Sequence, residues 1–117
     1  MVTKKIKIAT DFTDTPGPRY RDEGPCSGQE FREKFLVPAL QAGDSLEIDL
    51  DDTEGYGSSF LEEAFGGLVR IERFDKAELL KRLSFNSSDE TYIIQVKQYI
   101  SDAIPGEGAR RSAKARG

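Results

Sequence analysis

The 117-residue chain contains no histidine, no tryptophan and a single cysteine, Cys26. Without histidine it cannot form a Ser-His-Asp or Cys-His catalytic group of its own, and ordinary zinc sites are excluded as well. One cysteine cannot form an intramolecular disulfide, and the start of the chain lacks the long apolar stretch of a secretory signal, so we expect a cytoplasmic protein. No apolar run approaches the roughly 20 residues of a membrane span. We therefore expect a non-enzymatic protein with no cofactor and no membrane segment.

Charge is unevenly distributed along the sequence, whose formal net charge is −4 at pH 7. From Pro105 onward four basic residues accompany one acidic residue, a balance of +3, which leaves −7 for residues 1–104. Nucleic-acid binding needs a basic surface to displace counterions, so the acidic body argues against a nucleic-acid partner. The polar, glycine-containing end predicts a folded domain over 1–104 and a disordered basic tail over 105–117.

Three short segments alternate apolar and polar residues with a period of two, which is typical of strands with one buried face. They are KIKI (5–8), LEIDL (46–50) and RLSF (82–85). If the first two are neighbours, the outward lysines of one lie opposite the outward acidic residues of the other. That would be a favourable cross-strand pairing.

Helical patterns with recognisable starts follow or separate these strands. Each start has a serine or aspartate three residues before a glutamate, the spacing of a capping box. The four pairs are Ser27/Glu30, Ser59/Glu62, Asp75/Glu78 and Ser87/Glu90. Pro38 should kink the first helix or end it early, and Pro105-Gly106 should stop the last. The inward faces expected for the second and last helices are Leu61, Ala64, Phe65 and Leu68, and Ile93, Val96 or Lys97, Ile100 and Ile104.

The segment before the first helix is rich in turn residues. Pro16-Gly17-Pro18 could form the tip of a hairpin that returns as a strand through residues 19–21. Strands that alternate with helices indicate an α/β sheet with right-handed crossovers. The alternation within each strand indicates that helices cover mainly one face of that sheet. The open face and an unpaired edge favour a homo-oligomer.

The stretch GYGSSF (55–60) places two serines where a loop enters a predicted helix. One interpretation is structural: Ser59 caps the helix, a contribution of about 1 kcal/mol. A nucleophile is disfavoured, because the chain has no histidine base and the second glycine of a nucleophile elbow is missing. A third interpretation is a bound or covalent phosphate, which a helix N-terminus favours. A phosphoserine beside the acidic strand end would repel an acidic partner and so could switch an interface.

The run LEIDLDDTEGYGSSFLEEAFGGL (46–68) resembles the STAS domain of anti-sigma-factor antagonists, in which an apolar strand leads into Asp-Ser-Ser/Thr-Gly-Leu at a helix start. In that family an ATPase-like partner kinase phosphorylates the first serine and so controls partner exchange. Ser58 matches that serine, while Gly57 replaces the family aspartate and Phe60 the family glycine. The bacterial STAS-like domains of unknown function are a closer match, because CSGQEFRE (26–33) and GSSFLEEAFGGL (57–68) fit their pattern.

The resemblance covers roughly residues 1–104 and implies a STAS-like α/β fold, with four or five strands in a mixed sheet and helices mainly on one face. It implies a regulatory domain that binds a protein partner, such as an ATPase or kinase-like regulator, through the turn and helix at 54–72. Phosphorylation of Ser58 would be the switch, with Ser59 as the neighbouring candidate. The expected contact residues are Glu54, Tyr56, Gly57, Ser58, Phe60 and Glu63.

Arg19 and Arg21 support an alternative of a different class. In this hypothesis the helix start at Ser58 and Ser59 binds a nucleotide or phosphate ligand, and either arginine clamps its phosphate. In the opposing interpretation, these arginines lie on an exposed edge strand, where their charge discourages pairing with another chain. A run of acidic residues could also hold magnesium, but such runs are usually solvated surface, so no metal is expected. These acidic residues are Glu47, Asp49, Asp51, Asp52 and Glu54.

Overall fold

The computed structural model describes residues 2–107. Three strands, β1 (Thr3–Lys7), β2 (Ser45–Asp49) and β3 (Leu83–Asn86), form a parallel sheet in the order β1-β2-β3. The period-two alternation is confirmed, because the inward-facing residues Ile6, Leu46, Ile48 and Leu83 are all buried. The basic residues of the predicted tail lie within 108–117, outside the described residues.

Two long helices carry the sequence motifs. The first long helix comprises α2 (Gly28–Phe31), η2 (Arg32–Leu36) and α3 (Val37–Gln41), and the second comprises α4 (Ser58–Leu61), η3 (Glu62–Gly66) and α5 (Gly67–Arg70). Both η2 and η3 are single turns of π-helix, wider than the α-helical turns beside them. The other described helical elements are α1 (Ile8–Asp11), the 3-10 turn η1 (Arg21–Glu23), α6 (Lys76–Arg82) and α7 (Glu90–Asp102).

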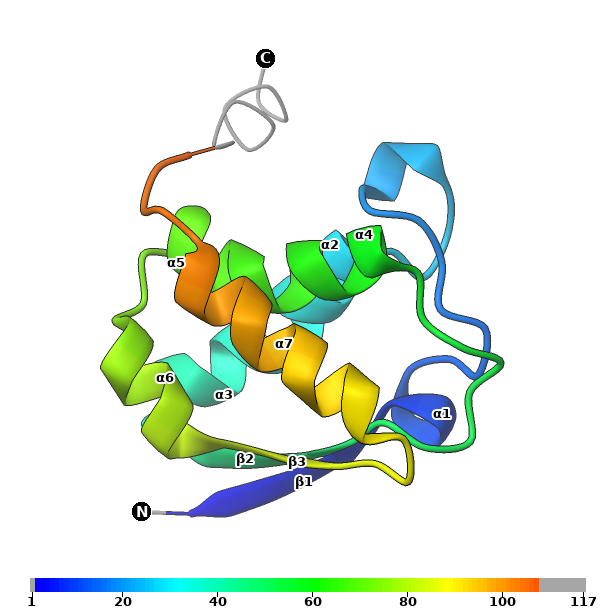
Figure 1. Ribbon diagram of the computed structural model, residues 1–117, viewed down its shortest axis with the longest axis horizontal. Coiled ribbons are helices and arrows are strands. Elements are labelled where there is room, and N and C mark those ends of the chain that lie inside the picture. Colours follow the sequence, from blue (N-terminus) through cyan, green and yellow to red (C-terminus); the bar gives the residue numbers. More distant parts are fainter. Residues whose placement is uncertain (1, 108–117) are drawn as a thin grey trace.

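The helices α2 to α7 lie on one side of the sheet, and the opposite face carries no helix among the described residues (Figure 1). On that open face Lys5 lies in register with Glu47, and Lys7 with Asp49. The Lys7 ammonium lies 3.8 Å from the Asp49 carboxylate. The predicted opposition of lysines and acidic residues is therefore confirmed. A charged face of this kind has little apolar surface to drive self-association, and the homo-oligomer stays a prediction.

The sheet of the described residues has three strands, all parallel, rather than the four or five strands of a mixed sheet. The expected return strand at 19–21 is absent, and the turn η1 overlaps this stretch. The carbonyls of Pro18 and Arg19 instead accept hydrogen bonds from the N–H groups of Gly28 (2.9 Å) and Gln29 (3.0 Å). Because these carbonyls cap the first long helix, they are not available to a sheet ladder.

Pro38 does not end the first long helix, which continues to Gln41. The π turn η2 precedes this residue, so Pro38 occupies the first turn of α3, where its missing N–H costs least. The expectation of an early end is therefore wrong. The chain leaves the helix through Gly43, whose φ of +91° is a conformation that glycine adopts without a Cβ penalty.

The last helix, α7, begins two residues later than predicted. Asp89 is its cap rather than Ser87, whose hydroxyl donates to the Asp89 carbonyl at 2.9 Å. The helix ends at Asp102, before Pro105, as predicted. Val96 and Ile100 are buried as expected, but Ile104 lies beyond the helix and is 55% exposed.

An aromatic cluster joins the two long helices and the sheet. The ring of Phe31 in the first helix lies 6.3 Å from that of Phe60 and 6.2 Å from that of Phe65 in the second. Phe65 in turn contacts Phe85 of β3 at 5.5 Å. The predicted inward face of the second helix is confirmed, since Leu61, Ala64, Phe65 and Leu68 are fully buried. This core fixes the helix that begins at the double serine.

Candidate functional site: a serine turn beside a buried charge network

The second long helix starts at Ser58 without a side-chain cap. Its N-cap residue is Gly57, and no side chain there accepts a hydrogen bond from the first turn. Ser58 is exposed and Ser59 is half-buried, and among residues 2–107 neither hydroxyl has a hydrogen-bond partner. The predicted capping box of Ser59 and Glu62 is therefore wrong. Two arginines bind the Glu62 carboxylate, so it does not turn back toward the helix start.

Asp51 ties the turn that leads to Ser58 to the neighbouring turn between β3 and α7. Its carboxylate accepts hydrogen bonds from the backbone N–H (2.8 Å) and the hydroxyl (3.0 Å) of Ser88. The backbone hydrogen bond is the main reason that the pKa of Asp51 is lowered. This carboxylate therefore stays charged and keeps the two turns together over the neutral pH range.

Tyr56 and Glu54 fix the rest of the turn. The Tyr56 hydroxyl donates to the Leu50 carbonyl at 2.8 Å, and its ring packs edge-on against Tyr92 with centroids 5.0 Å apart. Burial raises the pKa of Tyr56 to about 12, so the hydroxyl keeps its proton at neutral pH. The backbone N–H of Glu54 donates to the Asp14 carbonyl at 2.8 Å. The turn thus presents the serines from a backbone held at several points.

A buried ion pair joins the two long helices behind this turn. The side chains of Arg32 and Glu63 are 1% and 2% exposed. The Arg32 guanidinium donates through Nη1 to the Glu63 carboxylate and to the Glu63 carbonyl, both at 2.7 Å. Glu63 lies in the π turn η3, so this guanidinium contacts both the backbone and the side chain of that turn. Arg32 also donates to Glu72 at 3.0 Å. Its burial is therefore compensated by several partners.

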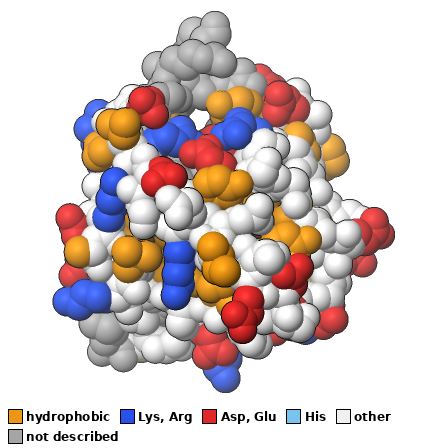
Figure 2. All heavy atoms as spheres, in the orientation of Figure 1, with side chains coloured by type: hydrophobic (Ala, Val, Ile, Leu, Met, Phe, Trp, Pro, Cys, Tyr) orange, Lys and Arg blue, Asp and Glu red, His pale blue; other side chains and the backbone are white. Residues whose placement is uncertain are grey.

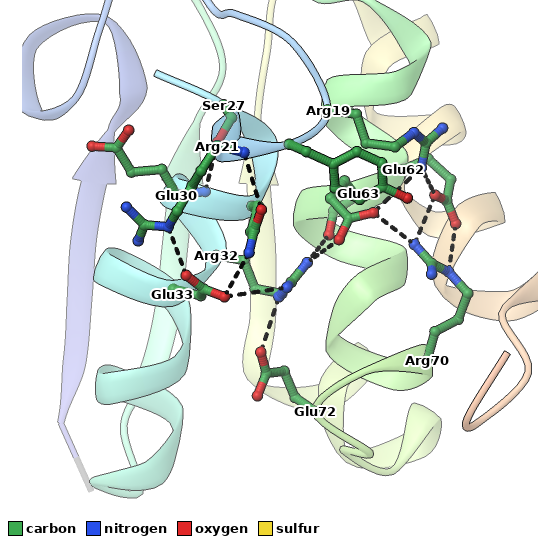
Figure 3. A network of polar contacts seen from close by, with 12 residues as sticks. Arg19, Arg21, Ser27, Glu30, Arg32, Glu33, Glu62, Glu63, Arg70 and Glu72 are labelled. Atoms are coloured by element: carbon green, nitrogen blue, oxygen red, sulfur yellow. Dashed lines mark hydrogen bonds and ion pairs between the residues drawn. The ribbon is translucent and has the colours of Figure 1, made fainter. Parts of the chain in front are cut away.

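Glu62 and Arg70 extend this network toward the surface. Arg70 donates through Nε (2.9 Å) and Nη2 (2.8 Å) to the two oxygens of Glu62, a bidentate pair. Burial disfavours the charged form of Arg70, but hydrogen bonds and the charges of Glu62 and Glu63 outweigh it and raise its pKa. Arg19 donates to Glu62 and, at 3.4 Å, to Glu63. Figure 3 shows the guanidinium groups of Arg19, Arg32 and Arg70 around these two adjacent carboxylates.

Two glycines make room for this arrangement. A Cβ atom at Gly67 would collide with the Arg32 guanidinium, and one at Gly28 would collide with the Phe60 carbonyl of the facing helix. Gly28 thus permits the close crossing of the two helices, and Gly67 provides space for the buried arginine. The two sequence motifs meet here: the first supplies Gly28 and Arg32, and the second supplies Phe60, Glu63 and Gly67.

The structure keeps four of the six expected contact residues within reach of solvent and buries the other two. Glu54, Gly57 and Ser58 are exposed, and Tyr56 is half-buried. Phe60 is 0% and Glu63 2% exposed. The prediction that these two side chains contact a partner is wrong, because Phe60 belongs to the aromatic core and Glu63 pairs with Arg32.

Arg19 and Arg21 are both already paired with carboxylates of this chain. Arg19 binds Glu62 and Glu63, and Arg21 Nε donates to Glu33 at 2.8 Å. The strand order β1-β2-β3 also lacks the reversal at which open α/β sheets form a ligand crevice. Neither feature supports the nucleotide or phosphate hypothesis.

One feature of the sequence does predict part of the buried charge network, although the motifs alone do not reveal it. Arg32 lies on the inward stripe of the first long helix, beside Phe31 and Phe35 in a helical period. A charged residue on an apolar stripe predicts a buried ion pair. Arg70 gave no such signal, because it lies eight residues after Glu62, which is not one of the spacings of three or four that pair side chains on a regular α-helix.

The acidic run at the end of β2 is partly neutralised. Lys7 donates to Asp52 at 2.6 Å, and this hydrogen bond is the main cause of the raised pKa of Lys7. Within residues 2–107, no group of three or more acidic or cysteine side chains is arranged to hold a metal ion. Over the same residues, no helix has both the length and the apolar character that crossing a membrane requires.

Comparison with protein families identifies the kind of domain. The family model described as a STAS-like domain of unknown function matches residues 27–92, more than half of the chain. The chain therefore belongs to this family of STAS-like domains. The matched range begins at the cap of the first long helix and ends in α7, so it includes the second motif, all of the first except Cys26, and the Arg32–Glu63 pair. Searches of curated proteins and of solved structures found no match.

Proposed function

We propose that this STAS-like domain is a non-catalytic regulatory module that binds a protein partner through the serine turn, which we define as residues 54–59. Phosphorylation of Ser58 switches the contact. One observation carries the proposal: the Ser58 hydroxyl is exposed and unbonded at the start of a long helix, on a turn whose backbone is fixed. A side chain with no structural contact there is free to take part in recognition.

The local chemistry suits a charge switch at this position. A phosphate adds roughly −1.5 to −2 charges at neutral pH. At an uncapped helix start this charge meets backbone N–H groups without a partner, so the modified domain stays folded. The partner, by resemblance to the antagonist family, is an ATPase or kinase-like regulator. The change in surface charge then acts on this partner without unfolding the domain.

The surroundings of the serines argue for binding rather than catalysis. No side chain of the described residues accepts the proton of either hydroxyl, and the chain has no histidine. The charged groups in the network behind the turn are matched in ion pairs, so none of them is poised as a base for these hydroxyls. We therefore propose no enzymatic activity, and the cytosol as the place of action.

The test is affinity capture from the source organism, with the wild type, Ser58→Ala, Ser58→Glu and a control, Ser101→Glu. Ser101 is exposed on α7, so the control adds the same charge elsewhere on the surface. We expect the wild type, Ser58→Ala and Ser101→Glu to retain one specific partner, and Ser58→Glu to lose it at least tenfold. Thermal unfolding of each variant checks the fold. Retention of the same partner by Ser58→Glu would refute the switch.

A further inference from the structure

The segment from Thr13 to Cys26, which we call the strap, lies on the molecule without entering its core. None of its residues is buried, whereas Ser27 immediately after it is 0% exposed and Phe12 immediately before it packs against the core. Segments without buried apolar side chains open locally at low cost in free energy. What holds the strap in place is therefore a set of polar contacts.

These contacts bind the strap to both long helices. On the first helix, the carbonyls of Pro18 and Arg19 accept from the N–H groups of Gly28 and Gln29. On the second helix, the Arg19 guanidinium binds Glu62 and Glu63 (Figure 3). Among residues 2–107, the strap forms ion pairs with the second long helix through Arg19.

We propose that Arg19 latches the strap, and that negative charge on Ser58 or Ser59 opens the latch by competing for its guanidinium. Residues four apart on a helix lie on one face, one turn from each other. Ser58 precedes Glu62 by four residues, and Ser59 precedes Glu63 by four. A phosphate on either serine therefore offers Arg19 a doubly charged partner one turn from the present one.

The network allows this exchange without leaving a buried charge alone. After Arg19 departs, Glu62 keeps its bidentate pair with Arg70, and Glu63 keeps Arg32 and Arg70. The opening thus removes the strap's contacts but not the ion pairs that join the helices. The regulatory half of this proposal rests on the proposed function, because it assumes phosphorylation of the serine turn. The latch itself does not.

Opening of the strap would also expose a second surface to a partner, at the start of the first long helix. The strap carbonyls cap the start of the first long helix, so their departure exposes the N–H groups of Gly28 and Gln29. A phosphate on the serine turn would then alter a second surface, at the start of the neighbouring helix.

The latch is tested by amide hydrogen exchange on the full chain. The readout is protection of the Gln29 amide, which donates to the Arg19 carbonyl, relative to the Ile48 amide in the central strand. We expect Arg19→Gln to lower protection of Gln29 about tenfold, as expected for the loss of one charged hydrogen bond, while Ile48 is unchanged. Arg19→Lys should restore most of it. Unchanged Gln29 protection in Arg19→Gln would refute the latch.

Arg21→Gln is the matched control on the strap. Arg21 binds only the half-exposed Glu33 through its side chain and is itself 41% exposed, so its loss should change Gln29 protection much less. An effect equal to that of Arg19→Gln would contradict a specific role for Arg19.

The regulatory half is tested by Ser58→Glu and Ser59→Glu, with Ser101→Glu as the charge control. At least one of the first two should lower Gln29 protection several-fold, and the control should not. No change in either would refute charge-driven opening even if Arg19 is the latch. Opening in Ser58→Glu together with undiminished partner capture would instead leave the latch standing and refute the proposed function.

Discussion

The two long helices begin in different ways. At the first, the Ser27 hydroxyl accepts from the Glu30 N–H at 3.0 Å, and the Glu30 carboxylate accepts from the Cys26 N–H at 3.2 Å. Two carbonyls of the strap bind further N–H groups of this helix. At the second, Gly57 is the cap and offers no side chain, and Ser58 makes no side-chain hydrogen bond. The first start is closed by local contacts and the second is open.

The glutamate three residues after the serine makes different contacts in the two helices. Glu30 lies at the surface beside Lys34, whose ammonium binds it at 3.0 Å without preventing it from reaching back to the helix start. Glu62 has the same spacing from Ser59, but Arg19 and Arg70 hold its carboxylate in the network. A capping box is a local preference worth about 1 kcal/mol, and charged partners from other elements outweigh it. In addition, the second helix begins two residues before Ser59 would cap it, because its N-cap is Gly57 and Ser59 lies within the first turn.

The largest effect is expected from removing the charge at the centre of the network. Arg32→Met should lower the free energy of unfolding by about 3 kcal/mol, because it breaks a buried ion pair and removes the hydrogen bond to the Glu63 carbonyl. Urea unfolding measures this value. Lys34→Met, on the exposed side of the same helix, should cost less than about 1 kcal/mol. Equal losses would show that the network contributes nothing beyond surface charge.

The second-largest loss of stability is expected at Gly28, where the start of the first long helix packs against the second. Gly28→Ala should destabilise by about 1–3 kcal/mol, because the added methyl group collides with the Phe60 carbonyl. Gly57→Ala is the control, since a Cβ there meets open space, and it should cost less than about 1 kcal/mol. Chemical unfolding of both variants compares them. A tolerated Gly28→Ala would mean that the helices do not cross at this glycine.

A direct comparison of the two starts comes from serine deletion. Ser27→Ala should cost about 1 kcal/mol, because it removes a buried cap, whereas Ser59→Ala should stay within about 0.5 kcal/mol. Equilibrium unfolding in guanidinium resolves the difference. If both variants lose the same stability, Ser59 caps its helix after all, and the second start is not open.

The smallest effect is a pH dependence at the first start. The hydrogen bond from Lys34 is the main reason that the pKa of Glu30 is lowered from its usual 4.5. Because the folded pKa lies below the unfolded one, the stabilisation is present above pH 4.5 and is lost as the pH falls through the folded value. Glu30→Gln should therefore be about 0.3–0.5 kcal/mol less stable than wild type at neutral pH, and the gap should close in acid, once the pH falls below the folded pKa of Glu30. A gap that persists in acid would point to lost packing instead of lost charge.

The sequence predicted the elements whose signals are local. Alternation of period two located all three strands, and Asp75 caps α6 as its spacing indicated, with its carboxylate accepting from the Glu78 N–H at 3.0 Å. These features need only neighbouring residues and one buried face. The inward face of the second long helix was predicted for the same reason.

The failures arose where distant residues compete for the same groups. Ser59 does not form a capping box, because the helix already begins after Gly57 and Arg19 and Arg70 bind Glu62. The stretch 19–21 does not form a strand, because carbonyls next to and within it cap another helix. Pro38 is accommodated because a π turn that begins at the buried Arg32 precedes it. The contact residues Phe60 and Glu63 were placed at the surface by motif position, although their helical period puts them inside. The helical period would have predicted the burial of Phe60 and Glu63, whereas the other contacts in this paragraph involve partners far away in the sequence.

Site-resolved mass spectrometry of the protein purified from its native cells tests most directly whether the open helix start is regulated. Tryptic peptides that span the serine turn would be quantified with and without phosphate across growth conditions. We predict phosphate on Ser58 in a fraction of molecules that changes with conditions, and none on Ser101. Ser58 and Ser59 unmodified under every condition in which the protein is made would contradict the proposed switch.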